Sequence, residues 1–476
     1  MIYGMTPAGH VAPKHARHIA SSRIGVGLEK LDRALYDPAP CYDAIGALGV
    51  KWVRIQSGWC RTESLRGVYD FMWLDSIVDN LIAQGTEPWL CLCYGNELYT
   101  PGANNRAGAV GRPPVATEPE RVAWDHYVTA VVRHFEGRVR YYEAWNEPDG
   151  AWCWRPEPDA RQYGGFALRT ARAIKAADPR AKVLAGSFCQ DLAFLYRMMS
   201  CELAEVVDAV TYHRYAFDVD VGVPAHVRNI RAILDSFGGQ HIGIVQGETG
   251  AQSAYSTRGA LRGAQWTERR QAKFLLRKIM VDLMSDVLFT SWFSTVDIFE
   301  NIQSDEGEMT RDWYGFFGLL GETFDEAGRP LGAYREKAAY GAMRTLCALF
   351  ADGVHRKELP VQFECRENSL TGGMDEDLRR ADAEILRQGF EAANGARCFA
   401  YWKPENILTA ELDASTTLSF IGQGEDVRLI DPYDGAVYVP APERVICRDG
   451  VTTLCSVPLR DYPLLITFGD FADVTK

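Results

Sequence analysis

The chain has 476 residues, of which 47% are hydrophobic and 24% are charged, and its formal net charge is -12 with a sequence pI near 5.4. This length allows one large domain with a smaller companion. A chain this negative excludes nucleic acid as a general partner, because binding a polyanion needs a positive face. No run of 18 or more apolar residues occurs in the sequence, so we also expect no membrane partner.

The first residues and the cysteines favour a cytoplasmic location. Residues 1–18 contain several basic residues but no apolar stretch of the kind that a signal peptide needs, so we expect no export signal. The twelve cysteines are not clustered, and some, such as Cys91 and Cys93, lie in apolar strand-like runs. We expect free and mainly buried thiols, as in a reducing compartment.

Between residues 22 and 345, short apolar runs alternate with longer amphipathic stretches, which is typical of β/α units and a parallel sheet. Thr117 and Glu120 form a predicted capping box that opens a helix running to Phe135. The sequence predicts eight strands, which is the number that closes a barrel. They are Ile24–Leu28, Trp52–Gln56, Pro88–Cys93, Val139–Trp145, Lys182–Ser187, Ala209–His213, Ile242–Gln246 and Val287–Phe293.

After about Leu349, apolar runs are separated by turn-rich segments, which is typical of an antiparallel β domain. We therefore predict an α/β chain, namely a (β/α)8 TIM barrel with a C-terminal antiparallel β-sandwich-like domain. Within that domain, Asp375 to Phe390 is expected to be helical or poorly ordered. The predicted divisions are an N-terminal extension (1–21), the barrel catalytic domain (22–348) and the accessory β domain (349–476).

Two glutamates follow predicted strands that face each other across the barrel. The fourth strand runs into Asn146-Glu147-Pro148, and the seventh runs into Gly247-Glu248-Thr249-Gly250. Reactive groups of such barrels lie at the carboxyl ends of the strands. Glycoside cleavage needs one carboxyl group that protonates the leaving oxygen and one that attacks the sugar or activates water, and a separation of about 5–5.5 Å leads to retention. We predict Glu147 as general acid/base, with a raised pKa, and Glu248 as the ionised nucleophile.

Each part of this interpretation has an alternative. Asn146-Glu147-Pro148 could be only a helix start, where a glutamate is favoured electrostatically. Glu143 is a rival carboxylate, because strand alternation points it to the same side as Glu147. It lies two residues deeper in the barrel, where a lone charge is costly, so we assign Glu143 and Arg54 a supporting ion pair.

Several motifs resemble glycoside hydrolase family 39, in clan A. They are the fourth strand with Asn146-Glu147-Pro148, the sixth strand as Val210-Thr211-Tyr212-His213-Arg214-Tyr215, and two later runs, Ser291 to Glu300 and Tyr314 to Leu320. The resemblance covers most of the barrel and is weak over the C-terminal domain. It implies Glu147 as acid/base, Glu248 as nucleophile and Asn146 as the group that holds the sugar 2-hydroxyl.

The resemblance also implies further groups around the donor sugar, namely His213 and Tyr215 as lining residues, Trp292 as an apolar floor and Glu300 as an acceptor for sugar hydroxyls. Each has a structural alternative: His213 could be a core histidine whose hydrogen bonds are made within the core, Tyr215 and Trp292 could be packed core aromatics, and Glu300 could be a solvated loop residue.

Two departures from the family pattern lie near the donor pocket. Gln56 stands where the family usually has histidine, and Thr249 follows the nucleophile where the family commonly has an aromatic residue. Gln56 is thus a further substrate-binding candidate, and the sugar cannot be copied from a family that includes β-xylosidases and α-L-iduronidases.

The sequence as a whole predicts a retaining, exo-acting glycoside hydrolase that cleaves β-glycosidic bonds, in a β-xyloside or a related β-glycoside, by double displacement. A pocket closed at one end is favoured by the long segment Gly95–Thr117, a rim or lid, and by aromatic residues in the predicted mouth loops. These are Trp59, Tyr94, Tyr99, Trp152, Trp154, Trp266, Trp313 and Tyr314. The expected partner is an oligosaccharide or glycoside substrate, with no cofactor and no metal.

Two other functions stay open. A non-catalytic carbohydrate-binding protein on a hydrolase scaffold would keep the fold without the chemistry. A metal-dependent barrel hydrolase would need histidine and carboxylate ligands at several strand ends, and only His213 among nine histidines occupies such a place. Whether the chain forms a homo-oligomer is also open.

Overall fold

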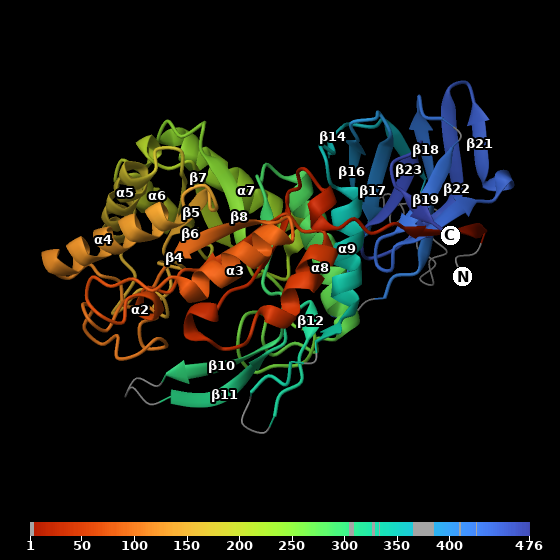
Figure 1. Cartoon of the computed structure of the whole chain (residues 1–476). Helices are drawn as coiled ribbons and strands as arrows, with labels where there is room; N and C mark the ends of the chain where they lie inside the picture. The colour runs from red at the N-terminus through yellow and green to blue at the C-terminus, as the bar shows by residue number, and fades with distance from the viewer. Residues whose placement is uncertain are drawn as a thin grey trace.

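The computed structural model describes residues 4–303, 309–325, 329–332, 334–364, 385–408, 411–424 and 426–476. Eight parallel strands close a barrel in sequence order (Figure 1). Pairing of the last strand with the first, with Thr290 beside Ile24, completes the circle. The predicted (β/α)8 barrel is confirmed. Its strands are β2 (Ile24–Gly27), β3 (Trp52–Gln56), β4 (Glu87–Leu92), β5 (Tyr141–Ala144), β6 (Lys182–Phe188), β7 (Ala209–His213), β8 (Gly243–Thr249) and β9 (Thr290–Trp292).

Helices lie on the outside of this barrel. The helix after β4 begins at the predicted cap, where Thr117 Oγ1 accepts from the Glu120 backbone N–H over 3.4 Å. The Glu120 carboxylate accepts from the backbone N–H of Ala116 rather than from that of Thr117, so the reciprocal bond lies one residue earlier than in the usual capping box. The α-helices are α1 (Tyr42–Leu48), α2 (Trp59–Thr62), α3 (Met72–Ala83), α4 (Glu118–His134), α5 (Ala160–Ala177), α6 (Leu192–Met199), α7 (Val219–Ser236), α8 (Glu268–Met284) and α9 (Ala338–Leu349). Short 3₁₀ helices span Ala16–His18, Leu31–Arg33, Ala39–Cys41, Leu203–Glu205 and Pro442–Arg444.

Two antiparallel sheets form the C-terminal region, which confirms the predicted β-sandwich-like companion. The larger sheet has the order β14-β16-β17-β23-β19-β20-β1-β24, and the smaller has the order β15-β18-β22-β21. The larger contains β14 (His355–Arg356), β16 (Leu386–Glu391), β17 (Arg397–Trp402), β23 (Leu464–Phe468), β19 (Val427–Asp431), β20 (Ala436–Pro440), β1 (Met5–Val11) and β24 (Val474–Thr475). The smaller contains β15 (Val361–Glu364), β18 (Ala414–Ile421), β22 (Val451–Leu459) and β21 (Val445–Arg448).

One expectation for this region is wrong in part. The end of the segment expected to be helical or poorly ordered, from Leu386 onward, is strand β16, and Phe390 pairs there with Cys398 of β17. Cross-strand pairing in an eight-stranded sheet decides the conformation of these residues. Residues 375–384 lie outside the described residues.

The N-terminal strand β1 lies in the C-terminal sheet and not beside the barrel. It pairs antiparallel with β20, with Met5 opposite Pro440, and with β24. Both ends of the chain therefore lie at the same side of the molecule, beyond α9 (Figure 1). Two small hairpins, β10 (Ile298–Gln303) with β11 (Met309–Gly315) and β12 (Leu320–Gly321) with β13 (Arg335–Glu336), follow the last barrel strand.

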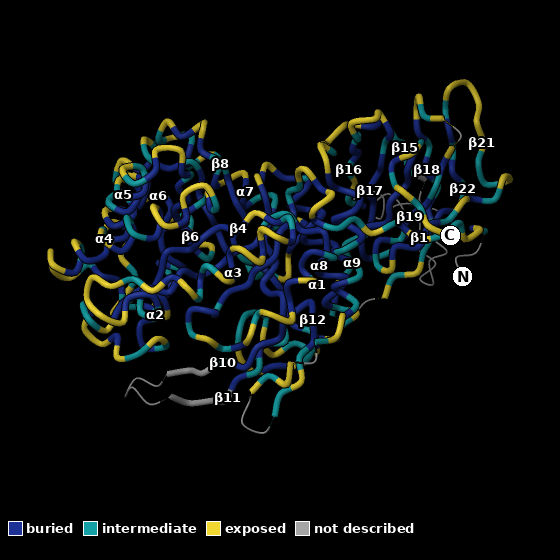
Figure 2. Tube along the Cα trace, in the orientation of Figure 1, coloured by how far each residue is buried: buried dark blue, intermediate teal, exposed yellow. Residues whose placement is uncertain are grey.

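Helix α8 is buried from Gln271 to Leu283, because it lies between the barrel and the C-terminal sheets (Figure 2). Its Arg277 forms an ion pair with Asp220 of α7, and Trp402 of β17 donates from Nε1 to Oδ1 of the same aspartate over 2.8 Å. Asp220 and Arg277 are almost completely buried. One carboxylate thus joins two barrel helices to the C-terminal sheet.

Two expectations from composition can be compared with this fold. The cysteines within the described ranges are free thiols, and Cys91 and Cys93 are buried in the core. Among the helices described, none combines the length and the apolar composition that crossing a membrane needs.

Candidate active site

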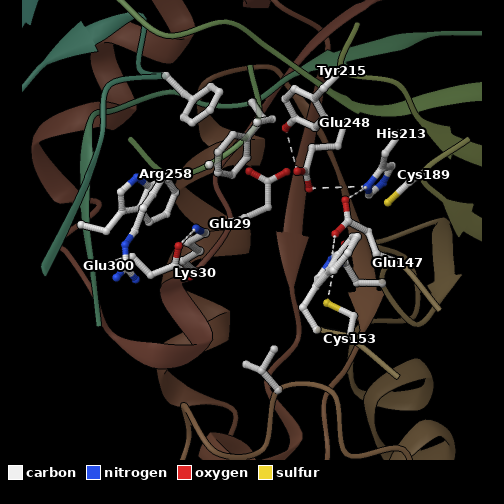
Figure 3. A pocket seen from close by; sticks show the side chains of 18 of the residues that line it. Glu29, Lys30, Glu147, Cys153, Cys189, His213, Tyr215, Glu248, Arg258 and Glu300 are labelled. Atoms are coloured by element: carbon white, nitrogen blue, oxygen red, sulfur yellow. Dashed lines mark hydrogen bonds and ion pairs between the residues drawn. The ribbon is translucent and has the colours of Figure 1, made fainter. Parts of the chain in front are cut away.

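A cavity of about 850 Å³ lies at the carboxyl ends of the barrel strands. Its base is formed by side chains that end β2, β3, β5, β7 and β8 or directly follow them (Figure 3). Its walls come from loops. Ala107 and Val110 of the segment predicted to form a rim line it on one side, and residues 257–262 line it on another. The predicted site residues Gln56, Asn146, Glu147, His213, Tyr215, Glu248 and Glu300 all line this cavity.

Glu147 and Glu248 face each other in it. Glu147 comes three residues after β5, in a turn where its φ is 45°, a left-handed conformation that is uncommon for a residue other than glycine. Glu248 lies near the end of β8. One oxygen of each carboxylate and Nδ1 or Nε2 of His213 all lie within 4.8 Å of one another. Both glutamate side chains are about nine-tenths buried, with 14% and 13% exposed.

Arg54 lies beneath the pair, at the centre of a buried network. Its Nε lies 2.7 Å from Glu143 Oε2, its Nη1 lies 3.0 Å from Glu248 Oε2, and its Nη2 donates to Asn146 Oδ1 over 2.9 Å. The ion pair expected between Arg54 and Glu143 is therefore present. Burial opposes the charge of Arg54, but the surrounding carboxylates outweigh it and hold its pKa well above the usual value. The pKa of Glu143 is lowered, because Arg54 and His213 outweigh the effect of its burial.

Glu147 is held by two hydrogen-bonding groups. His213 Nδ1 lies 3.0 Å from its Oε1, and Trp152 donates from Nε1 to its Oε2 over 2.5 Å. Burial raises the pKa of Glu147, but these contacts outweigh it, so that its pKa is lowered. The raised pKa expected for an acid catalyst is therefore wrong for this site, because the partners supplied by β7 and by the loop after β5 stabilise the carboxylate.

The hydrogen bonds around His213 require a proton between His213 and Glu147. Ser187 Oγ donates to Glu143 Oε1 over 2.7 Å, since an ionised carboxylate can only accept. Ser187 Oγ is also 3.2 Å from His213 Nε2, which must then be the donor. The 3.0 Å contact between His213 Nδ1 and Glu147 Oε1 needs one more proton, on either atom. The pair Glu147–His213 therefore holds one transferable proton between its two members.

Glu248 accepts from two neighbours. Tyr215 donates from its hydroxyl to Oε1 over 2.8 Å, and Arg54 binds Oε2. Burial and the charge of Glu248 raise the pKa of Tyr215 well above its usual value, so the phenol stays a donor. Thr249, the next residue, donates to the backbone carbonyl of Arg214 and thereby joins β8 to the end of β7.

The remaining predicted polar residues are Gln56 and Glu300, and Figure 3 shows Glu300 across the cavity from Glu147. Gln56 Oε1 accepts from the Lys30 backbone N–H and from Arg33 Nη2, each over 3.0 Å, while its Nε2 donates to the Tyr94 hydroxyl. Glu300 is bound by Lys30, whose Nζ lies 2.6 Å from its Oε2. Both are therefore fixed by contacts from the segment after β2.

Trp292 does not occupy its expected position. It is completely buried, it donates from Nε1 to the Phe317 carbonyl over 3.2 Å, and its ring packs edge-on against Phe274 of α8. It is not among the described residues that line the cavity, where Phe293, Trp313 and Phe317 supply aromatic surface. The physical reason is that the ring packs against Phe274 of α8 and is bonded to the Phe317 carbonyl, while the next residue, Phe293, reaches the cavity instead.

Sequence reasoning missed Glu29, Lys30 and Arg33, which all line the cavity. Glu29 and Lys30 closely follow β2, so the rule that singled out Glu147 and Glu248, a polar residue after an apolar run, applied to them as well, whereas Arg33 ends the short helix that comes next. Of the aromatic residues expected at the mouth, Tyr94, Trp152 and Trp313 line the cavity. Its described lining residues do not include Trp59, Tyr99, Trp154, Trp266 or Tyr314.

Glu147, His213 and Glu248 could together hold a cation, because their ligand atoms converge. The same atoms are also the hydrogen-bonding atoms of the carboxylate pair described above. Activity in excess chelator distinguishes the two uses.

Comparisons with known proteins agree with this geometry. The sequence model of the family described as glycosyl hydrolases family 39 matches residues 45–236. This range contains Asn146, Glu147, His213 and Tyr215 and ends before Glu248. No curated protein sequence matches the chain.

Solved structures share the fold at low identity. A family 39 glycoside hydrolase from the gut symbiont Bacteroides cellulosilyticus WH2 superposes with a TM-score of 0.64 and 16% identity, over 94% of this chain and 80% of its own. A monomeric β-xylosidase from Caulobacter crescentus CB15 gives 0.60 and 17%, over 97% of both chains. A family 30 endoxylanase from Clostridium papyrosolvens C71 gives 0.58 and 11%, over 97% of this chain and 98% of its own. The family match confirms, over residues 45–236, the resemblance to glycoside hydrolase family 39 that the sequence showed, and the solved structures share the fold of the chain.

Proposed function

We propose that the chain is a retaining, exo-acting glycoside hydrolase that cleaves β-glycosidic bonds, in a β-xyloside or a related β-glycoside, by double displacement. The observation that carries the proposal is the closeness of Glu147 and Glu248, which have oxygens within 4.8 Å of each other in one cavity. Retaining enzymes hold their two carboxyl groups about 5–5.5 Å apart, whereas inverting enzymes keep about 6.5–9.5 Å to admit a water molecule. The separation of the Glu147 and Glu248 oxygens agrees with the shorter distance, that of retaining enzymes.

In the first step, Glu248 attacks the anomeric carbon and the bond to the leaving group breaks. The proton held between Glu147 and His213 passes through Glu147 to the leaving oxygen, so that a neutral alcohol departs. Arg54 and Tyr215, which bind the two oxygens of Glu248, hold the nucleophile in one orientation. The product of this step is a glycosyl ester of Glu248.

In the second step, Glu147 is the base. It takes a proton from a water molecule that attacks the anomeric carbon from the side the leaving group has left, and the ester bond to Glu248 breaks. The lowered pKa of Glu147 suits this role, because a carboxylate is the form that the step needs. Sharing the proton with His213 lets one group serve in both steps.

The proposed contacts for sugar hydroxyls are Asn146, which is bonded to Arg54, and Gln56 and Glu300, which are bonded to the segment after β2. The rim loop and residues 257–262 wall the cavity, which supports action on the end of a substrate. A structural neighbour is a β-xylosidase, which makes aryl β-xylosides the first substrates to test.

The test is a panel of aryl β-glycosides, with the anomeric configuration of the first product followed by NMR. We expect turnover of at least one glycoside and an initial β-product. An initial α-product would contradict direct attack by Glu248. A panel without turnover, together with sugar binding that Glu248→Ala leaves unchanged, would instead identify a non-catalytic carbohydrate-binding protein.

A further inference from the structure

The carboxyl group of Glu29 lies in the cavity without a hydrogen bond of its own. Glu29 follows β2, is 2% exposed, and neither of its carboxyl oxygens has a hydrogen-bond partner among the described residues. Arg54 Nη1 lies 3.6 Å from Oε1, which is beyond hydrogen-bond distance. The guanidinium already binds Glu143, Asn146 and Glu248. Buried polar groups are nearly always paired, so this one indicates a missing partner.

The surrounding backbone makes room for this carboxyl group. A Cβ atom added to Gly27 would lie 2.0 Å from Oε2 of Glu29, so the absence of a side chain at Gly27 lets the carboxyl group fold back over β2. From there it points into the cavity toward Glu248 (Figure 3). Its place is therefore beside the nucleophile, on the opposite side from Glu147.

The charge state of Glu29 follows from its neighbours. Burial and the negative charge of Glu248 raise its pKa to about 8, because Arg54 and Lys30 compensate them only in part. Near neutral pH the group is a carboxylic acid, with one O–H donor and a carbonyl acceptor. A sugar hydroxyl can accept from the first and donate to the second, and a neutral group next to Glu248 does not repel the nucleophile.

We propose that Glu29 binds a hydroxyl group of the sugar in this cavity and is a residue that determines which sugars the site accepts. The inference rests on the proposed function, since it concerns the substrate of the same site. The two oxygens without partners, the space over Gly27 and the position beside Glu248 support it together. A sugar that lacks a hydroxyl paired with a buried polar group is cleaved with a much lower kcat/KM, because the protein group is then left unpaired.

The experiment is a double-mutant cycle between the protein and the sugar. For the aryl glycoside that the wild type cleaves best, kcat/KM is measured with the full sugar and with each monodeoxy analogue. The wild type and three variants, Glu29→Ala, Glu29→Leu and Glu29→Gln, are compared. For each protein, the kcat/KM of the full sugar is divided by the kcat/KM of the deoxy analogue. Comparing this ratio in a variant with the ratio in the wild type removes the intrinsic reactivity of the analogue and the general effect of the substitution.

We expect one position of the sugar at which Glu29→Ala and Glu29→Leu lose about 10- to 100-fold of the discrimination between full and deoxy sugar. Glu29→Gln, which keeps a donor and an acceptor, should retain most of it. Two variants without hydrogen-bonding groups are used so that a folding defect in one leaves the other, with folding checked by near-ultraviolet circular dichroism.

The outcomes separate this inference from the proposed function. Turnover by the wild type with the same discrimination in all variants at every position overturns the role of Glu29 alone. A wild type that hydrolyses no member of the glycoside panel overturns the proposed function, and the inference with it.

Discussion

The hydroxyl of Tyr215 donates to Oε1 of Glu248 over 2.8 Å, while Arg54 Nη1 lies 3.0 Å from the other oxygen of the same carboxylate. The proposed nucleophile is thus held by Tyr215, which follows the neighbouring strand β7, and by Arg54 of β3, which lies three strands from β8 in the circle. A carboxylate fixed in this way has little freedom to turn away from an anomeric carbon.

Replacing Glu248 by glycine should remove the nucleophile and leave room for a small anion. We expect kcat/KM for an aryl β-glycoside to fall by about 10⁴-fold or more. Azide should restore part of the activity and give a glycosyl azide of inverted configuration, because the anion attacks from the side of the missing carboxylate. Product NMR checks this. Rescue of Glu143→Gly by azide to a similar extent would contradict the assignment.

Glu147→Ala should affect substrates according to their leaving groups. Acid assistance contributes about 10²- to 10⁴-fold when the leaving oxygen needs a proton. We therefore expect a loss of that size for an alkyl glycoside, but a much smaller loss in the glycosylation step for a dinitrophenyl glycoside. Pre-steady-state release of the phenol measures this step. Equal losses for the two leaving groups would show that Glu147 is not the acid.

Trp152→Phe should shift the pH dependence of the reaction. The indole N–H donates to Glu147 Oε2 and helps to lower the pKa of that carboxyl group. Removal of this N–H raises the pKa of Glu147, so the acid form persists to higher pH. The alkaline limb of the pH profile of kcat/KM therefore moves to higher pH. Tyr196→Phe, at an exposed aromatic residue of α6, is the control and should leave the limb in place. A shift to lower pH in Trp152→Phe would disagree with the hydrogen bond.

Asp220→Ala should destabilise the protein. Removing this carboxylate leaves the buried Arg277 charge without its ion pair and takes the acceptor from Trp402. We expect the free energy of unfolding to fall by about 3–5 kcal/mol, measured by chemical denaturation. Asp218→Ala, at an exposed ion pair with Arg214 just before the same helix, should cost less than about 1 kcal/mol. Similar losses in both variants would argue against Asp220 as the link between barrel and sheet.

Excess chelator should leave kcat/KM unchanged. The proposed steps use Glu147 and Glu248 directly, although their atoms and those of His213 are close enough to hold a cation. Loss of activity after dialysis against a chelator, restored by one divalent cation, would contradict the two-carboxylate mechanism.

Much of the barrel could be predicted, because each strand is a short apolar run followed by a polar residue. The ranges expected for β3 and β7 agree with the structure at both ends. The place of Glu147 after β5 and of Glu248 on β8 followed from counting these runs. Glu29 obeys the same rule after β2 and was nevertheless missed, since neither the sequence motifs nor the resemblance drew attention to it.

Other features could not be predicted, since they depend on contacts between distant segments. Trp292 was expected in the cavity and is buried against α8, while the next residue, Phe293, lines the cavity instead. The lowered pKa of Glu147 comes from Trp152 and from His213, which lies 66 residues along the chain. Strand β1 pairs with strands more than 400 residues away in the sequence.

The sequence by itself determined the order of the strands and hence the pair of glutamates at opposite sides of the barrel, because apolar periodicity is a local property. The tertiary structure decided which side chains line the cavity and that Glu147 and His213 share a hydrogen bond. It also left the Glu29 carboxyl group buried without a partner. These depend on burial and on charges brought together across the barrel, which no local pattern specifies.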